Sequence, residues 1–177
     1  MDRNIVLIGF MGSGKSAVGR RLARRLHMEY LDTDSEIEAL VGMSVQEIFR
    51  RYGEKRFRSE EKALAARLAG RKGLVISSGG GMVLEPENVA NLRRNGVLVL
   101  LSATPAEVFR RLQRSRTQRP LLGRSFTKED IARLMAEREP YYACADISVT
   151  TTGKALDDVV ETILRALKEV DHANPAH

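Results

Sequence analysis

The sequence has little of what marks a secreted, membrane-bound or disulfide-stabilised protein. Its single cysteine, Cys144, excludes an internal disulfide and favours a reducing compartment. No apolar run approaches the length of a membrane span, and the first residues, MDRNIVLIGF, lack the organisation of a signal peptide. We therefore expect a cytoplasmic protein that does not act on membranes.

Aromatic residues are also scarce, at 5% of the chain, although the formal net charge is +6. A basic chain suits either nucleic acids or anionic small molecules. The densest basic stretch, RRLQRSRTQRPLLGR, has no interleaved aromatic side chain on which bases would stack. We expect small-molecule substrates and no nucleic acid, with nucleic-acid binding as the weaker alternative.

The chain has the length and patterning of one α/β domain. At 177 residues, with 43% hydrophobic and 29% charged residues, it can bury a full core. Apolar runs alternate with helical patterns, which indicates a parallel sheet built from βαβ units. The predicted strands are Ile5–Ile8, Tyr30–Asp32, Leu74–Ser77, Val97–Leu101 and Ile147–Val149. The predicted helices are Lys15–Leu26, Ser35–Leu40, Val45–Tyr52, Glu54–Leu68, Pro86–Arg94, Pro105–Arg114, Lys128–Cys144 and Leu156–Glu169.

Three segments depart from a simple alternation of strands and helices. Two consecutive helices between the second and third strands predict a small subdomain, about 34–70, over the edge of the sheet where ligands bind. Pro140 is expected to kink or split the helix predicted over Lys128–Cys144. The segment 115–126 is interpreted as a mobile loop. The domain is expected to span 1–170, followed by a disordered tail over 171–177.

The stretch IGFMGSGKS, which follows an apolar strand and opens a helix, matches G-x-x-x-x-G-K-[ST]. In this context the glycines let backbone N–H groups face phosphate oxygens, and the helix dipole favours anions at the same end. Lys15 would reach the β- and γ-phosphates, and the Ser16 hydroxyl would join a Mg²⁺ shell. A glycine-rich turn that matches by accident is the alternative; we interpret the stretch as a nucleoside-triphosphate site.

Candidate acidic groups follow the second strand, in YLDTD. Asp32 and Asp34 are two residues apart, so on a strand both would face the same cleft. Asp32 would bind the metal directly or through water, and Asp34 would accept a hydroxyl proton. The alternative is that Asp34 only caps the following helix.

Three further signals are individually weak. In FRSEE, Glu61 lies three residues after Arg58 and is close enough to orient it, although a solvated ion pair is the alternative. In SSGGGM, Gly79–Gly81 allow the backbone to approach a ligand, or form a loose turn. Arg138 is supplied by a late helix.

Together, GFMGSGKS, DTD, FRSEE, SSGGG, RPLL and ERxPYY resemble the shikimate kinases, in the order and approximate spacing of that family, over Asn4 to Val170. The resemblance implies a P-loop kinase fold: three α/β/α layers, a five-stranded parallel sheet in the order 2-3-1-4-5, a substrate-binding subdomain and a lid at about 115–126. It implies ATP-dependent phosphorylation of the 3-hydroxyl of shikimate, in the pathway to chorismate and aromatic amino acids. We expect a monomer.

The resemblance also assigns roles to particular residues. It implies that the phosphates of ATP contact Gly12, Ser13, Gly14, Lys15, Ser16 and Ala17, with Mg²⁺ at Ser16. It implies that shikimate contacts Asp34, Arg58, Gly80 and Arg138, and that Arg119 is the lid arginine that contacts ATP. Lys15, Asp34 and Arg119 are then the catalytic residues. Whether Arg111, Arg114 or Gly153, Lys154 and Ala155 touch the nucleotide stays open.

The chemistry of these residues agrees with a hydroxylated carboxylate as acceptor, because paired guanidinium groups bind a carboxylate through charge-assisted bonds. The nearest alternative is another P-loop small-molecule kinase, such as a gluconate or nucleoside-monophosphate kinase. A nucleotide-dependent regulatory protein without turnover is a further alternative.

Overall fold

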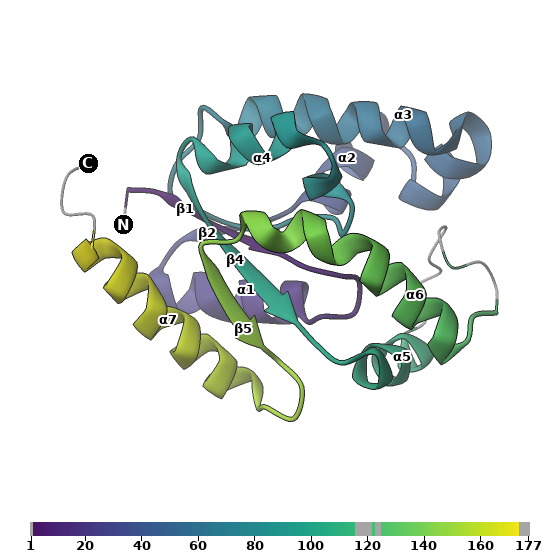
Figure 1. Ribbon diagram of the computed structural model, residues 1–177. Coiled ribbons are helices and arrows are strands. Elements are labelled where there is room, and N and C mark those ends of the chain that lie inside the picture. Colours follow the sequence, from purple (N-terminus) through teal and green to yellow (C-terminus); the bar gives the residue numbers. More distant parts are fainter. Residues whose placement is uncertain (1, 116–121, 123–124, 174–177) are drawn as a thin grey trace.

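Five strands form one parallel sheet at the centre of the computed structural model, which describes residues 2–115, 122 and 125–173 (Figure 1). The strands are β1 (Asn4–Ile8), β2 (Glu29–Asp32), β3 (Leu74–Ser77), β4 (Gly96–Ser102) and β5 (Ile147–Thr150). Their order is β2-β3-β1-β4-β5, with every neighbouring pair parallel. All five predicted strands and the predicted order are confirmed.

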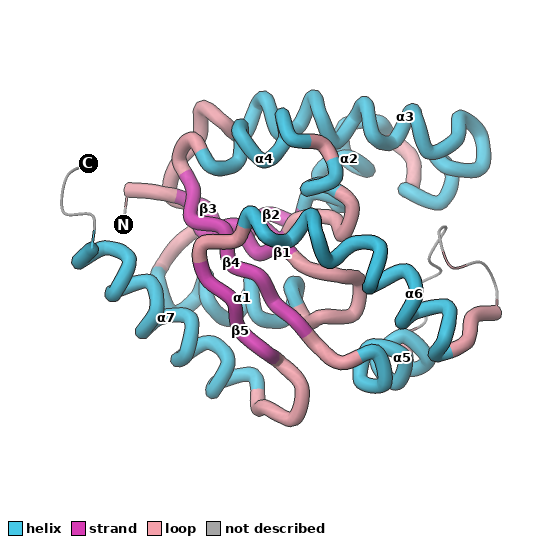
Figure 2. The backbone as a smooth tube through the Cα atoms, viewed as in Figure 1, coloured by secondary structure: helices cyan, strands magenta, loops and turns pink. Residues whose placement is uncertain are grey.

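Helices cover both faces of the sheet (Figure 2). The α-helices are α1 (Lys15–Leu26), α2 (Thr33–Val41), α3 (Val45–Leu68), α4 (Pro86–Arg93), α5 (Pro105–Arg114), α6 (Lys128–Arg138) and α7 (Leu156–Ala173). Two 3-10 helices, η1 (Met82–Leu84) and η2 (Glu139–Cys144), follow β3 and α6.

The central strand β1 divides the core because its side chains alternate between the two faces. Val6 and Ile8 lie in a cluster with α2, α3 and α4, whereas Ile5 and Leu7 lie in a cluster with α1 and α7. All four side chains are fully buried, which explains why the strand reads as a continuous apolar run rather than an alternating one. The three predicted layers are confirmed.

Local signals in the sequence explain where several helices begin and break. Ser44 caps α3 in a reciprocal capping box with Glu47. Gly53 interrupts α3 with φ 80° and ψ 175°, so the two helices predicted on either side of it form one element with a kink. Pro140 ends α6 at Arg138, and the chain continues as the 3-10 helix η2, as expected for a proline inside a helical pattern.

The arginines on the outer face of α1 are paired across the surface with α7. Arg21 contacts Asp157 through two hydrogen bonds of 2.7 and 2.8 Å, and Arg25 pairs with Glu161. The basic face of α1 therefore packs beside an acidic face of α7.

Two predictions are wrong in the structure. Asp32 and Asp34 do not share a strand face, because β2 ends at Asp32 and Asp34 lies in the first turn of α2, although both residues line one cavity as expected. The tail predicted to be disordered from 171 begins inside α7, which continues to Ala173; the rest of the tail lies outside the described residues. Within the described ranges, no helix is long and apolar enough to span a membrane.

Candidate active site

The loop between β1 and α1 borders a cavity that we call the P-loop cavity. Its glycines make the loop conformation possible: Gly14 has φ 102°, and a Cβ on Gly9 would lie 2.3 Å from the carbonyl oxygen of Leu101. The cavity opens at the N-terminus of α1, where no acidic side chain stands in the first turn. Its lining includes Gly12, Gly14, Lys15, Ser16, Ala17, Arg20, Asp32, Asp34, Ser78, Gly79, Gly80 and Arg111.

Lys15 is buried and held against the loop. Its Nζ donates to the carbonyl oxygens of Gly9 at 2.7 Å and Phe10 at 2.9 Å. The ammonium group is therefore in the cavity wall, next to the backbone that the motif assigns to phosphate binding.

Asp32 both caps α2 and contacts Ser16, two roles that the sequence analysis assigned to different residues. Its Oδ1 accepts from the backbone N–H of Ser35 at 3.1 Å and so caps α2, a role considered for Asp34 in the sequence. Its Oδ2 accepts from the Ser16 hydroxyl at 3.3 Å and from the Tyr30 hydroxyl at 3.4 Å. A hydroxyl and a carboxylate oxygen are thus adjacent at the edge of the P-loop cavity.

Arg111, whose role was left open, lines the P-loop cavity and binds the backbone of the loop. Its Nη1 donates to the Gly12 carbonyl at 3.1 Å and to the Thr151 hydroxyl at 3.0 Å, and its Nε pairs with Glu107 at 2.7 Å. Thr151 in turn donates to the carbonyl of Ser13 at 3.0 Å. These bonds satisfy the Gly12 and Ser13 carbonyls of the loop. Ser13, which was predicted to contact phosphate, is buried and is not among the residues that line the P-loop cavity.

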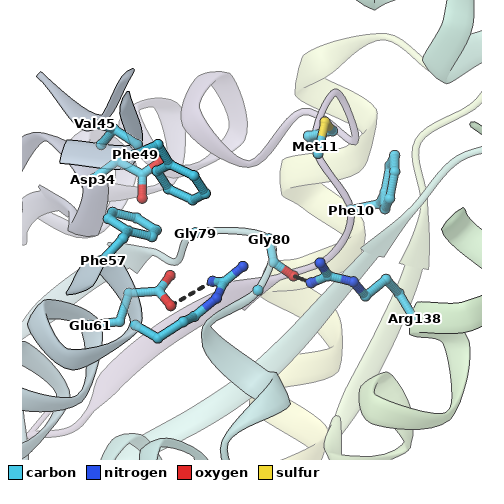
Figure 3. Close-up of a pocket in the computed structure, with 12 residues that line it drawn as sticks. Phe10, Met11, Asp34, Val45, Phe49, Phe57, Glu61, Gly79, Gly80 and Arg138 are labelled. Atoms are coloured by element: carbon cyan, nitrogen blue, oxygen red, sulfur yellow. Dashed lines mark hydrogen bonds and ion pairs between the residues drawn. The ribbon is translucent and has the colours of Figure 1, made fainter. Parts of the chain in front are cut away.

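A second cavity, which we call the Arg58 cavity, lies next to the first (Figure 3). Side chains from α2, α3 and α6 line it together with the turn that follows β3. Its lining residues are Phe10, Met11, Asp34, Val45, Phe49, Phe57, Arg58, Glu61, Gly79, Gly80, Gly81 and Arg138. The four residues predicted to contact the acceptor, Asp34, Arg58, Gly80 and Arg138, are therefore brought together.

Arg58 is held by a buried carboxylate. Its Nη1 donates to Glu61 Oε2 at 2.6 Å and its Nη2 donates to Glu54 at 3.0 Å. The Glu61 side chain is only 1% exposed, so this pair is not the solvated ion pair that the sequence left as an alternative. A Cβ on Gly81 would lie 2.3 Å from Arg58 Nη1, so a larger residue there would displace the guanidinium that packs on the turn.

Asp34 belongs to both cavities. It lines the Arg58 cavity and the P-loop cavity together with Met11, Gly79 and Gly80. A Cβ on Gly79 would lie 2.8 Å from Asp34 Oδ1 and 3.0 Å from Glu61 Oε1, so two carboxyl groups close on the bare backbone of this glycine. The Asp34 carboxylate therefore stands at the junction between the phosphate loop and the two arginines.

Arg138 approaches from the end of α6, on the other side of Gly80 from Glu61 (Figure 3). Its Nη1 donates to the Gly80 carbonyl at 3.4 Å. The Tyr142 hydroxyl donates to the same oxygen at 3.2 Å. Tyr142 was not among the predicted site residues; it stands in the ERxPYY motif, and that was the one signal that pointed to it.

Arg119 lies outside the described residues, as does most of the segment predicted to form the lid, namely 116–121 and 123–124. Its predicted contact with ATP therefore stays a prediction.

Burial of Glu61 makes stability depend on pH. Desolvation raises the pKa of this carboxyl from 4.5 to about 6, and the Arg58 charge opposes the rise only in part. The folded state then holds the proton more tightly than the unfolded chain, so the free energy of unfolding falls as the pH rises through this window.

We expect Glu61→Gln to remove this fall of about 2 kcal/mol, measured by urea unfolding at steps between pH 4.5 and 7. Glu60→Gln, on the outer side of α3, should keep it. Curves that run parallel in wild type and Glu61→Gln would contradict a titration in this range.

A phosphate-binding loop between β1 and α1, a sheet in the order β2-β3-β1-β4-β5 and an adjoining cavity for an acceptor together define a P-loop kinase of small molecules. The family model of shikimate kinase matches residues 11–168. A shikimate kinase from Pelotomaculum thermopropionicum is 54% identical over 167 residues, which cover 94% of this chain and 96% of that protein. The chain belongs to the shikimate kinase family.

Solved structures agree with this assignment. The structure of a shikimate kinase from Acinetobacter baumannii in complex with shikimate matches with a TM-score of 0.89 and 34% identity, over 96% of this chain and 94% of that one. A gluconokinase from Sinorhizobium meliloti matches with a TM-score of 0.66 over 99% of this chain and 98% of that one. At 18% identity, the gluconokinase shows a common fold alone.

Proposed function

We propose that this protein transfers the γ-phosphoryl group of ATP to the 3-hydroxyl of shikimate, in the pathway to chorismate and aromatic amino acids. One observation carries the proposal: Asp34 lies in the wall of both cavities, between the phosphate loop and the arginine pair. A hydroxyl bound in the Arg58 cavity beside Asp34 would face a phosphate held by the loop.

The two arginines suit the carboxylate of such an acceptor. Arg58 and Arg138 come from α3 and α6 and line the same cavity, where guanidinium groups bind carboxylates through paired, charge-assisted bonds. Glu61 and Glu54 orient Arg58, and the Gly80 carbonyl orients Arg138. The apolar side chains of Phe49, Phe57 and Val45 would exclude water around the bound acceptor.

The transfer step follows from this arrangement. The acceptor oxygen forms a bond to the γ-phosphorus while the bond to the β–γ bridging oxygen breaks, and ADP leaves. Asp34 takes the proton of the acceptor hydroxyl. Lys15 and the loop N–H groups, at Gly12 to Ala17, stabilise the negative charge on the phosphoryl oxygens.

Ser16 and Asp32 fit a magnesium ion. Their hydroxyl and carboxylate oxygens lie 3.3 Å apart at the edge of the P-loop cavity, and Mg²⁺ in phosphoryl-transfer enzymes takes one or two protein oxygens besides phosphate and water. When bound, the ion neutralises charge on the β- and γ-phosphates. Asp32 keeps its Oδ2 toward Ser16 because Oδ1 caps α2.

Three finer assignments are also proposals. On the resemblance of its QRPLL segment, we propose that Arg119 contacts ATP from a lid. We further propose a monomer and a cytoplasmic location, the latter in agreement with the single cysteine.

The test is ADP release in a coupled assay with ATP, Mg²⁺ and one acceptor at a time: shikimate, gluconate or AMP. We expect fast turnover with shikimate and little with the other two, because the chain belongs to the shikimate kinase family and AMP has no carboxylate for the two arginines. Gluconate is the stricter comparison, since it is also a hydroxylated carboxylate. Equal or faster ADP release with gluconate would identify a different P-loop small-molecule kinase.

A further inference from the structure

The floor of the Arg58 cavity is bare backbone. Gly79 and Gly80 follow β3, line both cavities and carry no side chain that could anchor them. Consecutive glycines have the largest conformational freedom of any residues, so an unanchored turn of this kind would not hold one geometry. Something else must hold it.

Besides Arg138 and the bond of 3.1 Å from the Met82 N–H to the Gly79 carbonyl, two side chains from distant parts of the chain bind this turn. The backbone N–H of Gly79 donates to Thr33 Oγ1 at 2.8 Å, and the Tyr142 hydroxyl donates to the Gly80 carbonyl at 3.2 Å. Thr33 is 0% exposed and Tyr142 is 9% exposed. Neither residue is among those that line the Arg58 cavity or the P-loop cavity. The turn is therefore held through the N–H donor of Gly79 and through the carbonyl acceptor of Gly80.

The positions of the two anchors in the chain connect them to the chemistry. Thr33 is the residue before Asp34, at the start of α2. Tyr142 follows Arg138 by one turn of chain, in the 3-10 helix that Pro140 imposes. The position of Asp34 relative to Arg138 thus depends on the backbone of Gly79 and Gly80, to which the neighbouring Thr33 and Tyr142 are bonded.

Tyr142 also leaves Arg138 available to an acceptor. The carbonyl of Gly80 has two lone pairs and accepts from both residues. When the Arg138 guanidinium turns to a carboxylate, the phenol hydroxyl still satisfies this carbonyl. Burial raises the pKa of Tyr142 to about 12, so the hydroxyl keeps its proton and stays a donor at neutral pH.

We propose that Tyr142 and Thr33 are positioning residues, which hold the Gly79–Gly80 backbone between Arg138 and Asp34 and act on the reaction without touching the acceptor. Tyr142 supports the arginine side and so sets affinity for the acceptor, whereas Thr33 supports the carboxylate side and so sets the rate of transfer. The proposal rests on the proposed function, because both effects are defined for shikimate as acceptor.

The first experiment compares Tyr142→Phe with Tyr141→Phe. The adjacent Tyr141 is 47% exposed and serves as the matched control. Loss of one neutral hydrogen bond should raise the KM for shikimate about 3- to 10-fold, with kcat within about twofold of wild type and the KM for ATP unchanged. Tyr141→Phe should match wild type. An unchanged KM for shikimate in Tyr142→Phe, or an equal rise in Tyr141→Phe, would overturn the role of Tyr142.

The second experiment replaces Thr33 by Val, which has nearly the same shape but cannot accept the Gly79 N–H bond, and by Ser, which keeps the hydroxyl. Thr33→Val should lower kcat about 3- to 10-fold at saturating shikimate and ATP, and Thr33→Ser should restore it to near the wild-type value. If Thr33→Val does not fold, Thr33→Ala, which also lacks the hydroxyl, takes its place in the comparison with Thr33→Ser. A KM for ATP that rises in parallel with the KM for shikimate would show a general loss of structure and overturn the proposal.

Failure of the proposed function gives a different result. Wild-type protein that turns over gluconate or AMP but not shikimate would overturn the assigned acceptor, whereas wild-type turnover of shikimate with no effect in Tyr142→Phe or Thr33→Val overturns only the positioning roles.

Discussion

Replacement of Asp34 by Asn is expected to lower kcat by about 10²–10⁴ while the protein stays folded. Asn has the shape of Asp but cannot take the proton of the acceptor hydroxyl. Because Asp32, and not Asp34, caps α2, the helix keeps its cap in the variant. The measurements are kcat at saturating shikimate and ATP, together with the thermal unfolding temperature.

The matched control is Glu36→Gln, which removes one negative charge from the same first turn of α2. This variant should keep the wild-type kcat, so that a loss in Asp34→Asn is not explained by the helix dipole alone. Near-normal kcat in Asp34→Asn would show that Asp34 does not act as the base, and the junction of the two cavities would then have a structural role.

Removal of the Arg138 side chain should weaken shikimate binding by about 2–5 kcal/mol, because one partner of a desolvated charge pair is lost. This corresponds to a factor of about thirty to several thousand in Kd. Arg138→Ala is the clean variant, since the bond it breaks is one to the Gly80 carbonyl, which Tyr142 still satisfies. Binding is measured by calorimetry with shikimate, and separately with ATP, for which little change is expected.

Arg58 needs a different design. Arg58→Ala would leave Glu61 buried beside Asp34 without its guanidinium, and the loss of stability would obscure the loss of binding. Arg58→Lys keeps the charge but removes the paired geometry, so it should weaken shikimate binding while the protein stays folded. The controls are Arg133→Ala on the exposed side of α6 and Arg56→Ala on the exposed side of α3. Unaltered shikimate affinity in both Arg138→Ala and Arg58→Lys would leave these arginines without a role in binding.

The basic stretch at the end of α5 shows a limit of prediction from a sequence pattern, because the pattern did not indicate which arginine binds the phosphate loop. The cluster of arginines from Arg110 onward was compatible with contacts to nucleotide, but periodicity did not distinguish one arginine from another. In the structure Arg110 pairs with Glu107 on the surface, whereas Arg111 reaches the Gly12 carbonyl. The difference of one position turns the side chain about 100° around the helix, and the neighbouring Thr151 at the end of β5 decides which arginine is held.

Glu61 was identified as a partner of Arg58 from its spacing alone, since residues three apart on a helix are neighbours. Its burial could not be predicted in that way. The carboxyl lies against the backbone of Gly79, which comes from another part of the fold, and desolvation by burial raises its pKa. Likewise, the pattern of α2 did not show that Asp32 would cap it, because β2 ends one residue before the helix begins and leaves no turn between them.

The strands and the phosphate-binding loop could be predicted because each depends on residues that are close along the chain, whereas the order of the strands came from the family resemblance. The nine residues of IGFMGSGKS are enough to predict the conformation of the loop, and the apolar runs are enough to predict the buried strands. The resemblance named Asp34, Arg58, Gly80 and Arg138 as one set, but the folded structure was needed to show that they line one cavity and that Thr33 and Tyr142 bind its glycine backbone. The physical reason is that burial and hydrogen bonds between α2, the turn after β3 and η2 join residues far apart in sequence, and no local pattern encodes those distances.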